Sequence, residues 1–372
     1  MVANKRCFRQ TSGLDDEMAS TWSTTRRSNK RDTTQLKTPT MLDNPTHRTA
    51  QYPSNRPPVM MVIVDTEEEF DWDKPFARSN TATTNIGKQN LTESIFAEYG
   101  VIPTYVIDYP VATQSWALTI LRGLLEVRKC EIGTHLHPWV NPPFEEDITT
   151  KNSYPGNLPA ELEFRKLEAL TQAVEMNLGL RPTVYKAGRY GVGPATANSL
   201  ERLGYEIDCS VVPHTSFEES EGPNFQNAPD QPYWFGNGRM LEIPLTTNFV
   251  GIGWALGPLL YPIVTRRTFR RCHMPGLLAR SGILERITLT PEGVDHAAHL
   301  RLIKALLDRG HRIFSLTYHS PSLGLGHTPY VRTGEDLQRL LERIRGILHF
   351  FKFECKGEFI TPTRLRAVLA EG

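Results

Sequence analysis

The stretch Val59-Met-Met-Val-Ile-Val-Asp-Thr-Glu-Glu-Glu69 decides the fold, because six apolar residues are followed at once by acids. A short, β-branched apolar run is typical of a strand buried on both faces, as in parallel sheets. Residues two apart in a strand share a face, so Asp65 and Glu67 should point the same way. Two carboxylates on one face repel each other unless a cation lies between them. The stretch therefore predicts a metal site with a general base, or else a solvated acidic turn.

Strand and helix patterns alternate along the chain after this stretch. The patterns predict strands near 104–107, 130–132, 183–185, 205–208, 241–243 and 312–317, and helices ending at 99 or spanning 116–127, 159–178, 195–203, 294–309 and 335–351. Such alternation is typical of an α/β fold with a parallel sheet or barrel. These folds build their functional sites at the carboxyl ends of the strands, so polar residues at those ends are candidate site residues.

Histidines follow two of these strands. His135 and His137 lie in the expected loop 133–139, and their spacing puts both imidazoles on one side, a common way to hold a transition metal. The same spacing also arises by chance on surfaces. His319 follows the strand at 312–317 and is either a proton shuttle near neutral pH or a structural histidine.

A glycine-rich turn, Gly188-Arg-Tyr-Gly-Val-Gly193, follows another strand, and Asp208 ends the next one. Glycines for a phosphate and an acid for a ribose would suit a nicotinamide-dependent oxidoreductase. The glycine order differs from G-x-G-x-x-G, and the turn does not follow the first strand. This alternative also assigns no role to the acids and histidines above.

Residues 249–264 are apolar but interrupted by glycines and prolines, and Arg266, Arg267, Arg270 and Arg271 follow them. The expected structure is a buried strand plus a loop. The alternative is a hydrophobic lip in peripheral contact with a membrane, because basic flanks suit anionic lipids.

The first 57 residues differ in composition from the rest. They are rich in Ser, Thr, Arg, Asn and Asp, and hold ten Lys and Arg against five Asp and Glu. They offer too little apolar surface to offset the entropy of ordering. We therefore expect a disordered basic and polar tail over 1–57 and a single folded domain over 58–372.

The whole chain of 372 residues carries a formal charge of +1, which argues against a nucleic-acid partner. No apolar run is long enough to span a membrane, so we expect no transmembrane segment. The polar, basic start lacks the apolar core of a signal peptide. Five scattered cysteines suit a reducing compartment. The expected localisation is cytoplasmic.

From about Met60 to Leu323, the order of motifs resembles the polysaccharide deacetylase (NodB-homology) family of carbohydrate esterases, and within it the WalW-like branch. The matching pieces are the acids after the first strand, Glu98-Tyr-Gly-Val-Ile-Pro-Thr-Tyr105, Glu131-Ile-Gly-Thr-His-Leu-His-Pro-Trp139, Tyr185-Lys-Ala-Gly-Arg-Tyr-Gly191, Leu203-Gly-Tyr-Glu-Ile-Asp-Cys-Ser210 and His319-Ser-Pro-Ser-Leu323. The resemblance implies a distorted (β/α) barrel and a hydrolase that removes N-acetyl groups from amino sugars of a surface polysaccharide or its precursor.

The resemblance also implies a divalent metal, with Zn²⁺ expected, held by one acid and two histidines. It suggests Asp65 as the catalytic base and Glu67 as the metal ligand. The family's usual acids are adjacent, so Glu67 as base with Glu68 as ligand stays open. His135 matches the first metal histidine. The second usually lies four residues later, where this chain has Trp139, so His137 is expected to replace it.

The remaining roles follow from this resemblance together with the chemistry of amide hydrolysis. His319 is expected to protonate the leaving amine, and Lys186 occupies the place of the family's site arginine, with Arg189 as a replacement that keeps Asp65 ionised. A backbone N–H near Arg189 or Tyr190 would complete an oxyanion hole. The expected contacts for the N-acetylated saccharide are Lys186, Tyr190, Trp139 and Trp234. For Trp234, in the aromatic run Tyr233-Trp-Phe235, an anchoring role in packing is the alternative to stacking on a sugar ring. The altered histidine spacing leaves a rival open: a catalytically degraded, carbohydrate-binding relative of the same fold.

Overall fold

The computed structural model describes residues 47–127 and 129–371. Most of the expected tail lies outside the described residues, but its last part is folded, which corrects the boundary expected at residue 57. Strand β1 (Arg48–Thr49) pairs with β7 (Tyr233–Phe235), and the Ala50 N–H donates to the Pro232 carbonyl at 2.9 Å. Ala50 is buried against the domain, so the fold begins before residue 58.

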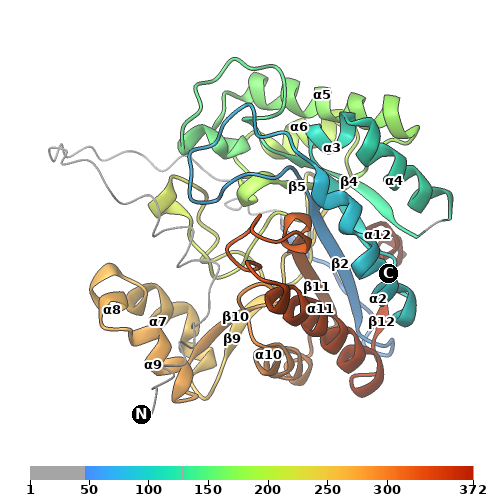
Figure 1. Ribbon diagram of the computed structural model, residues 1–372. Coiled ribbons are helices and arrows are strands. Elements are labelled where there is room, and N and C mark those ends of the chain that lie inside the picture. The colour runs from blue at the N-terminus through green and yellow to red at the C-terminus, as the bar shows by residue number, and fades with distance from the viewer. Residues whose placement is uncertain (1–46, 128, 372) are drawn as a thin grey trace, which may run out of the picture.

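A largely parallel sheet forms the centre of the molecule (Figure 1). Its strand order is β1-β7-β8-β6-β5-β4-β3-β2-β11, and β12 also pairs with β2. The further strands are β2 (Val59–Thr66), β3 (Thr104–Ile107), β4 (Glu131–Leu136), β5 (Val184–Ala187), β6 (Ile207–Asp208), β8 (Met240–Glu242), β11 (Ile313–His319) and β12 (Glu358–Phe359). Only β1, β7 and β8 pair with antiparallel neighbours in this sheet. A separate antiparallel hairpin joins β9 (Thr247–Val250) to β10 (Glu285–Thr288).

The sheet curls into a distorted barrel. Neighbouring strands lie about 4.8 Å apart, so in a flat sheet β5 and β11 would be roughly 19 Å apart. The Lys186 ammonium on β5 nevertheless donates to Thr317 Oγ1 on β11 at 2.9 Å. Between β8 and β11 the wall is completed by Thr246, whose N–H donates to Ser315 Oγ at 3.0 Å. The alternation of strands and helices predicted a parallel sheet or barrel, and the distorted (β/α) barrel that the resemblance implies is confirmed.

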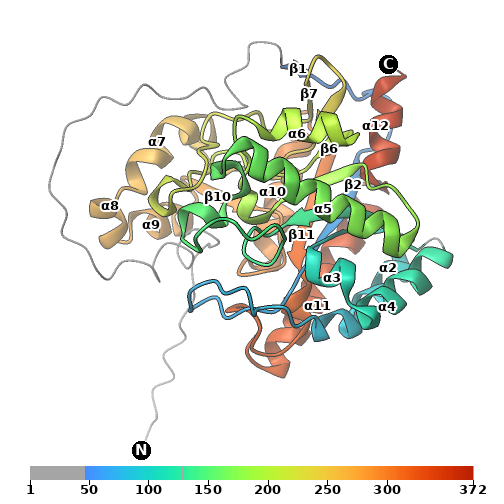
Figure 2. The ribbon, with the colours of Figure 1, turned by 90° about the horizontal axis from the view of Figure 1, so that it is seen from above.

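Helices cover the outside of this barrel (Figures 1 and 2). They are α2 (Asn90–Tyr99), α3 (Tyr109–Thr113), α4 (Ser115–Glu126), α5 (Ala160–Leu178), α6 (Thr196–Leu203), α10 (His296–Asp308) and α11 (Gly334–His349), the last continued by a π turn (Phe350–Glu354). Helix α12 (Pro362–Ala370) packs Leu365 and Leu369 into the barrel interior. Helices α7 (Gly257–Val264), α8 (Arg267–Arg271) and α9 (Met274–Arg280) project beside the β9–β10 hairpin.

Local sequence sets the helix ends. Gly100 stops α2 in the left-handed conformation with φ 74°, as expected for a glycine at that position. Asp108 begins α3 by accepting the Val111 N–H at 2.8 Å. Thr333 and Asp336 begin α11 with a reciprocal capping box. These caps fix where the helices begin and end relative to the strands.

The alternation along β2 assigns each side chain to one of two cores. Met60, Val62 and Val64 pack outward with the helices. Val59, Met61 and Ile63 face the barrel interior. The interior face continues to Asp65 and Glu67, which are both buried. The barrel interior is therefore apolar along most of β2 and acidic where the strand ends.

Two sequence expectations about loops are wrong. Residues 249–264 are not a buried strand plus loop: β9 ends at Val250, and a 3-10 turn (Trp254–Leu256) and α7 follow with exposed apolar side chains. The expected loop 133–139 is half strand, because β4 extends to Leu136. Among the described residues, no helix has both the length and the hydropathy needed to cross a membrane.

Candidate metal centre and active site

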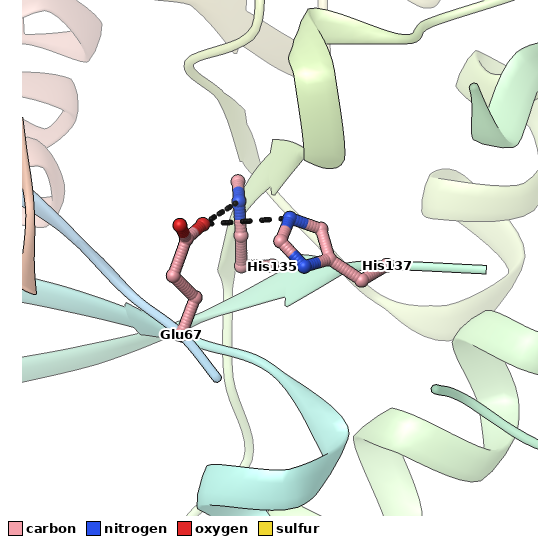
Figure 3. A group of neighbouring side chains, drawn as sticks. All are labelled: Glu67, His135 and His137. Atoms are coloured by element: carbon pink, nitrogen blue, oxygen red, sulfur yellow. Dashed lines mark ion pairs between the residues drawn. The ribbon is translucent and has the colours of Figure 1, made fainter. Parts of the chain in front are cut away.

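The acids after β2 and the histidines of β4 meet at the carboxyl end of the barrel (Figure 3). Sheet register explains the meeting. Asp65 is level with Val106 on β3, which is level with Gly133 on β4. Glu67 and His135 each lie two residues further along their strands, on the same side of the sheet. A Cβ on Gly133 would lie 2.7 Å from the Val184 carbonyl, so only glycine fits there.

Glu67, His135 and His137 form a compact triad. Glu67 Oε2 lies 3.3 Å from His135 Nε2 and 3.4 Å from His137 Nε2. All three side chains are buried, and their potential ligand atoms lie within 4.8 Å of one another. Two imidazoles and one carboxylate are a known ligand set for a catalytic zinc ion. The arrangement brings His137, the expected second histidine, together with His135 and Glu67.

The hydrogen bonds behind the triad set the histidine tautomers. His135 Nδ1 lies 3.0 Å from the Lys186 carbonyl, which can only accept, so this nitrogen carries the proton. His137 Nδ1 lies 2.7 Å from Glu68 Oε2 and donates to that carboxylate. Both Nε2 lone pairs therefore face Glu67. Ligands held in this way by outer partners are typical of metal sites.

Glu67 lacks a satisfied environment in the absence of a cation. Its Oε1 is buried, and no hydrogen-bond partner for it exists among the described residues. Burial, and then the charges of Glu68, Asp65, Asp108 and Glu292, raise the pKa of Glu67 well above its usual value. Burial also lowers the pKa of His135 well below its usual value and that of His137 to about 4. Neutral imidazoles suit a divalent cation as they stand, and a cation at this position would replace the proton that Glu67 otherwise tends to hold, so the residues present fit a metal.

Glu68 orients the triad from outside it. Glu68 accepts the Trp139 Nε1–H at 2.7 Å as well as the His137 Nδ1–H, and its own N–H donates to Asp108 Oδ2 at 2.6 Å. Burial raises the pKa of Glu68 to about 7, opposed by its hydrogen bonds with Asp108 and Trp139. A second acid–histidine group, of Glu68, Asp108 and His137, uses the opposite nitrogen of the same imidazole. The geometry thus favours Glu67 over Glu68 as the ligand facing both histidines.

Asp65 is paired with Lys186 rather than with the two histidines. The Lys186 ammonium donates to both Asp65 oxygens at 2.6 and 2.7 Å. Burial alone would raise the pKa of Asp65, but Lys186, assisted by His135 and His319, holds it below its usual value. Asp65 is therefore an ionised carboxylate next to the triad, as a general base requires.

His319 lies on the other side of Asp65. Its Nε2 is 3.6 Å from Asp65 Oδ2, because the two residues are register partners on β11 and β2. Its Nδ1 donates to Glu292 Oε2 at 2.8 Å, and Glu292 also accepts from the His319 N–H and from Ser322. Burial would lower the pKa of His319, but the Glu292 carboxylate raises it above the usual value. Sequence reasoning missed Glu292; its only signal was an acid two residues after the strand-like run 287–290.

An aromatic wall that sequence reasoning also missed lines the same region, in the loop after β2. The Trp72 ring meets the His319 ring edge-on at 5.2 Å between centroids and lies 5.8 Å from Tyr330. Phe70 stacks on Trp72 at 5.7 Å. Phe70 and Trp72 are half-buried, so part of each ring faces solvent. The run of Phe and Trp at 70–76 was a visible signal.

Four of the residues expected from the resemblance need correction or refinement. Arg189 does not hold Asp65: its guanidinium donates to Ser153, lies 4.0 Å from the Tyr154 ring centre, and is replaced in the expected role by Lys186. Trp139 is buried, stacked on His137 at 4.3 Å, so it positions that histidine instead of offering a surface to a sugar. Trp234 lies in the core at the β1–β7 pairing, away from the triad.

Tyr190 is the fourth of these residues. It is buried with its hydroxyl lacking a hydrogen-bond partner among the described residues, and its ring centre lies 5.1 Å from the Lys186 ammonium. Arg189 and Tyr190 both adopt left-handed backbone, with φ of 53° and 59°. Consecutive non-glycine residues in this region are costly and are found mainly where function or packing demands them. The turn places the Tyr190 ring beside the Asp65–Lys186 pair.

The glycine turn does not form a dinucleotide site. A Cβ on Gly193 would lie 2.2 Å from the Gly156 carbonyl, and one on Gly191 would lie 2.7 Å from Pro155. These glycines allow two chain segments to pack closely. Asp208, the expected ribose ligand, is fully buried and accepts from Ser210. The structure therefore gives a packing reason for the turn.

No family model matches the chain, and no curated protein does. Solved structures similar to it include a "putative polysaccharide deacetylase" from Mycobacterium smegmatis (16% identity, covering 87% of this chain and 94% of that chain, TM-score 0.48). Another is a CE4 esterase of Streptococcus mutans (10% identity, covering 83% of this chain and 87% of that chain, TM-score 0.41). A third is a CE4 family pseudoenzyme of Bacillus anthracis (8% identity, covering 84% of this chain and 66% of that chain, TM-score 0.39). These names agree with the family that the order of motifs resembles. The WalW-like branch stays a prediction.

Proposed function

We propose that this protein is a metal-dependent hydrolase that removes N-acyl groups from amino sugars of a polysaccharide or its precursor. The observation that carries the proposal is the convergence of Glu67, His135 and His137, with both Nε2 atoms facing one carboxylate oxygen. An ionised Asp65 and a protonatable His319 flank that triad. Base, ligands and acid are the parts that hydrolysis of an amide needs in one place.

Glu67, His135 and His137 would hold the divalent cation, and their donor set suits Zn²⁺. When bound, such a cation polarises an acyl oxygen and lowers the pKa of water to about 7. The chain's own contribution begins with position. The hydrogen bonds of Glu68 and of the Lys186 carbonyl keep the two imidazoles aimed at one point before any ligand arrives.

Asp65 takes a proton from the attacking water, because Lys186 keeps its carboxylate ionised inside a buried site. His319 gives a proton to the leaving nitrogen, which cannot depart as an anion at neutral pH. Glu292 holds the His319 ring with Nε2 toward Asp65 and raises its pKa, so the imidazolium is available. The products are the free amine and the carboxylic acid, so one water is consumed for each amide bond broken.

The aromatic wall of Phe70 and Trp72 is the proposed platform for the sugar. Aromatic rings stack on the apolar faces of sugar rings, and Trp72 also has a buried Nε1–H that no described residue accepts. Its place against His319 would bring an N-acyl group next to the proposed acid. This wall takes over the role expected for Trp234.

Metal analysis and an activity assay on three proteins test the proposal. Elemental mass spectrometry should find a divalent metal in the wild-type protein, and acetate release from N-acetylated oligosaccharides should stop with chelator and return with Zn²⁺. Glu67→Ala should lose both metal and activity. Asp65→Asn should keep the metal and lose activity by about 10³-fold, because it removes only the base.

Glu126→Ala, on the exposed face of α4, is the matched control and should change neither quantity. If Asp65→Asn loses the metal while Glu67→Ala keeps it, the two roles are reversed. If the wild-type protein binds N-acetylated oligosaccharides and metal but releases no acetate, the protein is the carbohydrate-binding relative instead.

A further inference from the structure

The segment from residue 251 to residue 284, which we call the α7–α9 lobe, stands out from the barrel beside the β9–β10 hairpin (Figures 1 and 2). Its inner side is anchored. Tyr261 packs on Phe249 of β9 at 5.2 Å between ring centres. A Cβ on Gly257 would lie 2.3 Å from the Phe249 ring, so the helix touches the hairpin directly. The lobe is thus a held part of the fold with one face against the barrel.

The other face of α7 is apolar and exposed. Leu256, Leu259, Leu260 and Ile263 are 54, 71, 40 and 43% exposed. Their spacing of i, i+3, i+4 and i+7 is the spacing of an apolar helix stripe, which a globular protein normally turns toward its core. Here the stripe points away from the core.

The exposed apolar side chains of the protein are concentrated on this lobe. Nine of the seventeen large hydrophobic side chains exposed in the described part of the chain lie on it. Besides the four on the α7 stripe, they are Ile252, Trp254, Phe269, Leu277 and Ile283. Scattered exposed hydrophobics need no explanation, but a contiguous group marks a surface that contacts something.

The charge of the lobe has one sign. Residues 243–284 contain no Asp or Glu, although the whole chain carries 42 basic against 41 acidic residues. The lobe carries five arginines, and Arg266, Arg267, Arg271 and Arg280 are exposed. Arg270 reaches Glu219, outside the lobe, at 3.5 Å. A surface that is both apolar and cationic complements phosphate headgroups over acyl chains.

We propose that the α7–α9 lobe docks on the surface of an anionic lipid bilayer. The α7 stripe enters the boundary between headgroups and acyl chains, and the exposed arginines of α8 and α9 contact lipid phosphates. Trp254 is half-exposed, and the Arg309 guanidinium lies 3.7 Å from its ring centre. On a docked lobe, Trp254 lies at the interface between membrane and water, where tryptophan is favoured. Helix α7 is eight residues long, so the lobe lies on the bilayer and does not cross it.

The lobe is joined to the active site by a short path. Strand β10 runs from the lobe to Thr288, and Glu292, which holds His319, follows four residues later. A docked lobe would therefore bring the mouth of the barrel near the bilayer and favour a saccharide carried on a lipid. This corollary rests on the proposed function, whereas the docking itself does not.

Vesicle sedimentation tests the docking without any substrate. The purified protein should sediment with phosphatidylcholine vesicles that contain phosphatidylglycerol, and at least tenfold less with phosphatidylcholine alone. Binding should weaken as salt is raised. Each arginine near an anionic surface changes the partition coefficient by about fivefold, so Arg267→Glu/Arg271→Glu should reduce binding by at least 25-fold. Leu259→Ser/Leu260→Ser should reduce it by at least tenfold.

Matched controls lie elsewhere on the surface. Helix α12 lies far from the lobe in both views, and α5 carries Met176, which is 77% exposed. The variants Arg364→Glu, at an exposed position of α12, and Met176→Ser should bind vesicles as the wild type does. Brominated lipids should quench the wild-type tryptophan fluorescence, and Trp254→Phe should lose most of that quenching. All variants should keep the wild-type thermal unfolding midpoint, because the altered side chains point away from the core.

Equal binding to neutral and anionic vesicles, or lobe variants that sediment like the wild type, would overturn the proposal. So would the absence of vesicle binding together with a dimer that Leu259→Ser/Leu260→Ser dissociates, because the lobe would then contact a second copy of the chain. Loss of vesicle binding with acetate release from soluble oligosaccharides unchanged would separate docking from the proposed chemistry.

Discussion

Two groups of buried carboxyl groups in this protein offset the cost of burying negative charge in different ways. At the barrel mouth, Asp65 has Lys186 against it and Glu67 faces two imidazoles. On the outer face of the sheet, Asp208 and Glu242 are register partners on β6 and β8, and their carboxyl groups are hydrogen-bonded to each other. We call the latter the outer acid pair.

The outer acid pair limits its buried negative charge by holding protons. Burial raises the pKa of Asp208 to about 6, and burial together with the charge of Asp208 raises that of Glu242 well above its usual value. At the mouth, a lysine supplies one fixed positive charge, and neutral imidazoles leave room for a cation. The difference shows that burial of acids alone does not mark a metal site. The marker is a set of lone pairs converging on an unsatisfied oxygen.

Among the substitutions that test this difference, one at Lys186 should have the largest effect on stability. Lys186→Met leaves Asp65 as an unpaired buried charge, which should lower the free energy of unfolding by about 3–5 kcal/mol. Urea unfolding followed by circular dichroism measures the change.

The double variant Lys186→Met/Asp65→Asn is the control, because it removes the stranded charge and should recover most of the loss. If the double variant is as unstable as the single one, the lysine contributes packing and not charge compensation. That outcome would remove the contrast with the outer acid pair.

The next largest effect concerns the hydrogen bond from Trp139 to Glu68. Trp139→Phe keeps an aromatic ring stacked near His137 but removes the Nε1–H that Glu68 accepts. Loss of such an outer-shell contact should weaken metal affinity by about 10- to 100-fold, measured by competition with a coloured chelator. Trp116→Phe, half-exposed on α4, is the matched control and should not change the affinity. Unchanged affinity in Trp139→Phe would mean that Glu68 needs only His137 to hold its place.

The smallest effect is expected in the outer acid pair. A carboxyl with a raised pKa binds its proton more tightly in the folded protein. The stability it contributes is present below its unfolded pKa of about 4 and is lost as pH rises through its folded pKa. For Asp208, that loss extends from about pH 4 to about pH 6, and for Glu242, whose pKa is raised further, it continues to higher pH. The unfolding free energy of the wild type should therefore fall between pH 5 and pH 8.

Glu242→Gln removes the carboxyl that must take up a proton on folding at high pH, and it keeps the oxygen that accepts the Val211 N–H at 3.0 Å. It should be about 1–2 kcal/mol more stable than the wild type at pH 8, with a smaller difference at pH 5. Unfolding in urea across that pH range measures both, and Glu126→Gln on the surface should follow the wild type. A variant less stable than the wild type at pH 8 would show that the pair shares a stabilising proton there.

Local pattern predicted much of this fold because side-chain period is a local property. The apolar run before Asp65, the glycine stop at Gly100 and the alternation of strands and helices all led to elements that the structure contains. The polar residues placed after predicted strands, His135, His137 and His319, do converge at one end of the barrel. Period two along β2 also separated Asp65 and Glu67 from Glu68.

Errors arose where a residue's partner is remote in the chain. Arg189 was expected to pair with Asp65, but Lys186, on strand β5, reaches Asp65 instead because the sheet curls. Trp234 is an aromatic residue of the kind that can stack on a sugar, but its strand, β7, lies between β1 and β8 and its side chain is in the core. Residues 249–264 were expected to form a buried strand plus a loop, with an exposed hydrophobic lip as the alternative. Hydropathy alone does not tell whether an apolar segment is buried or exposed.

The sequence by itself determined the class of fold, the face of each strand and the identity of the chemical groups at the strand ends, since each follows from spacing along a few residues. Only the tertiary structure decided which groups become partners. Lys186 and Asp65 are 121 positions apart, and Glu292 and His319 are 27 apart. Their pairing depends on how far the sheet curls and on the register between strands, and no local pattern encodes either quantity.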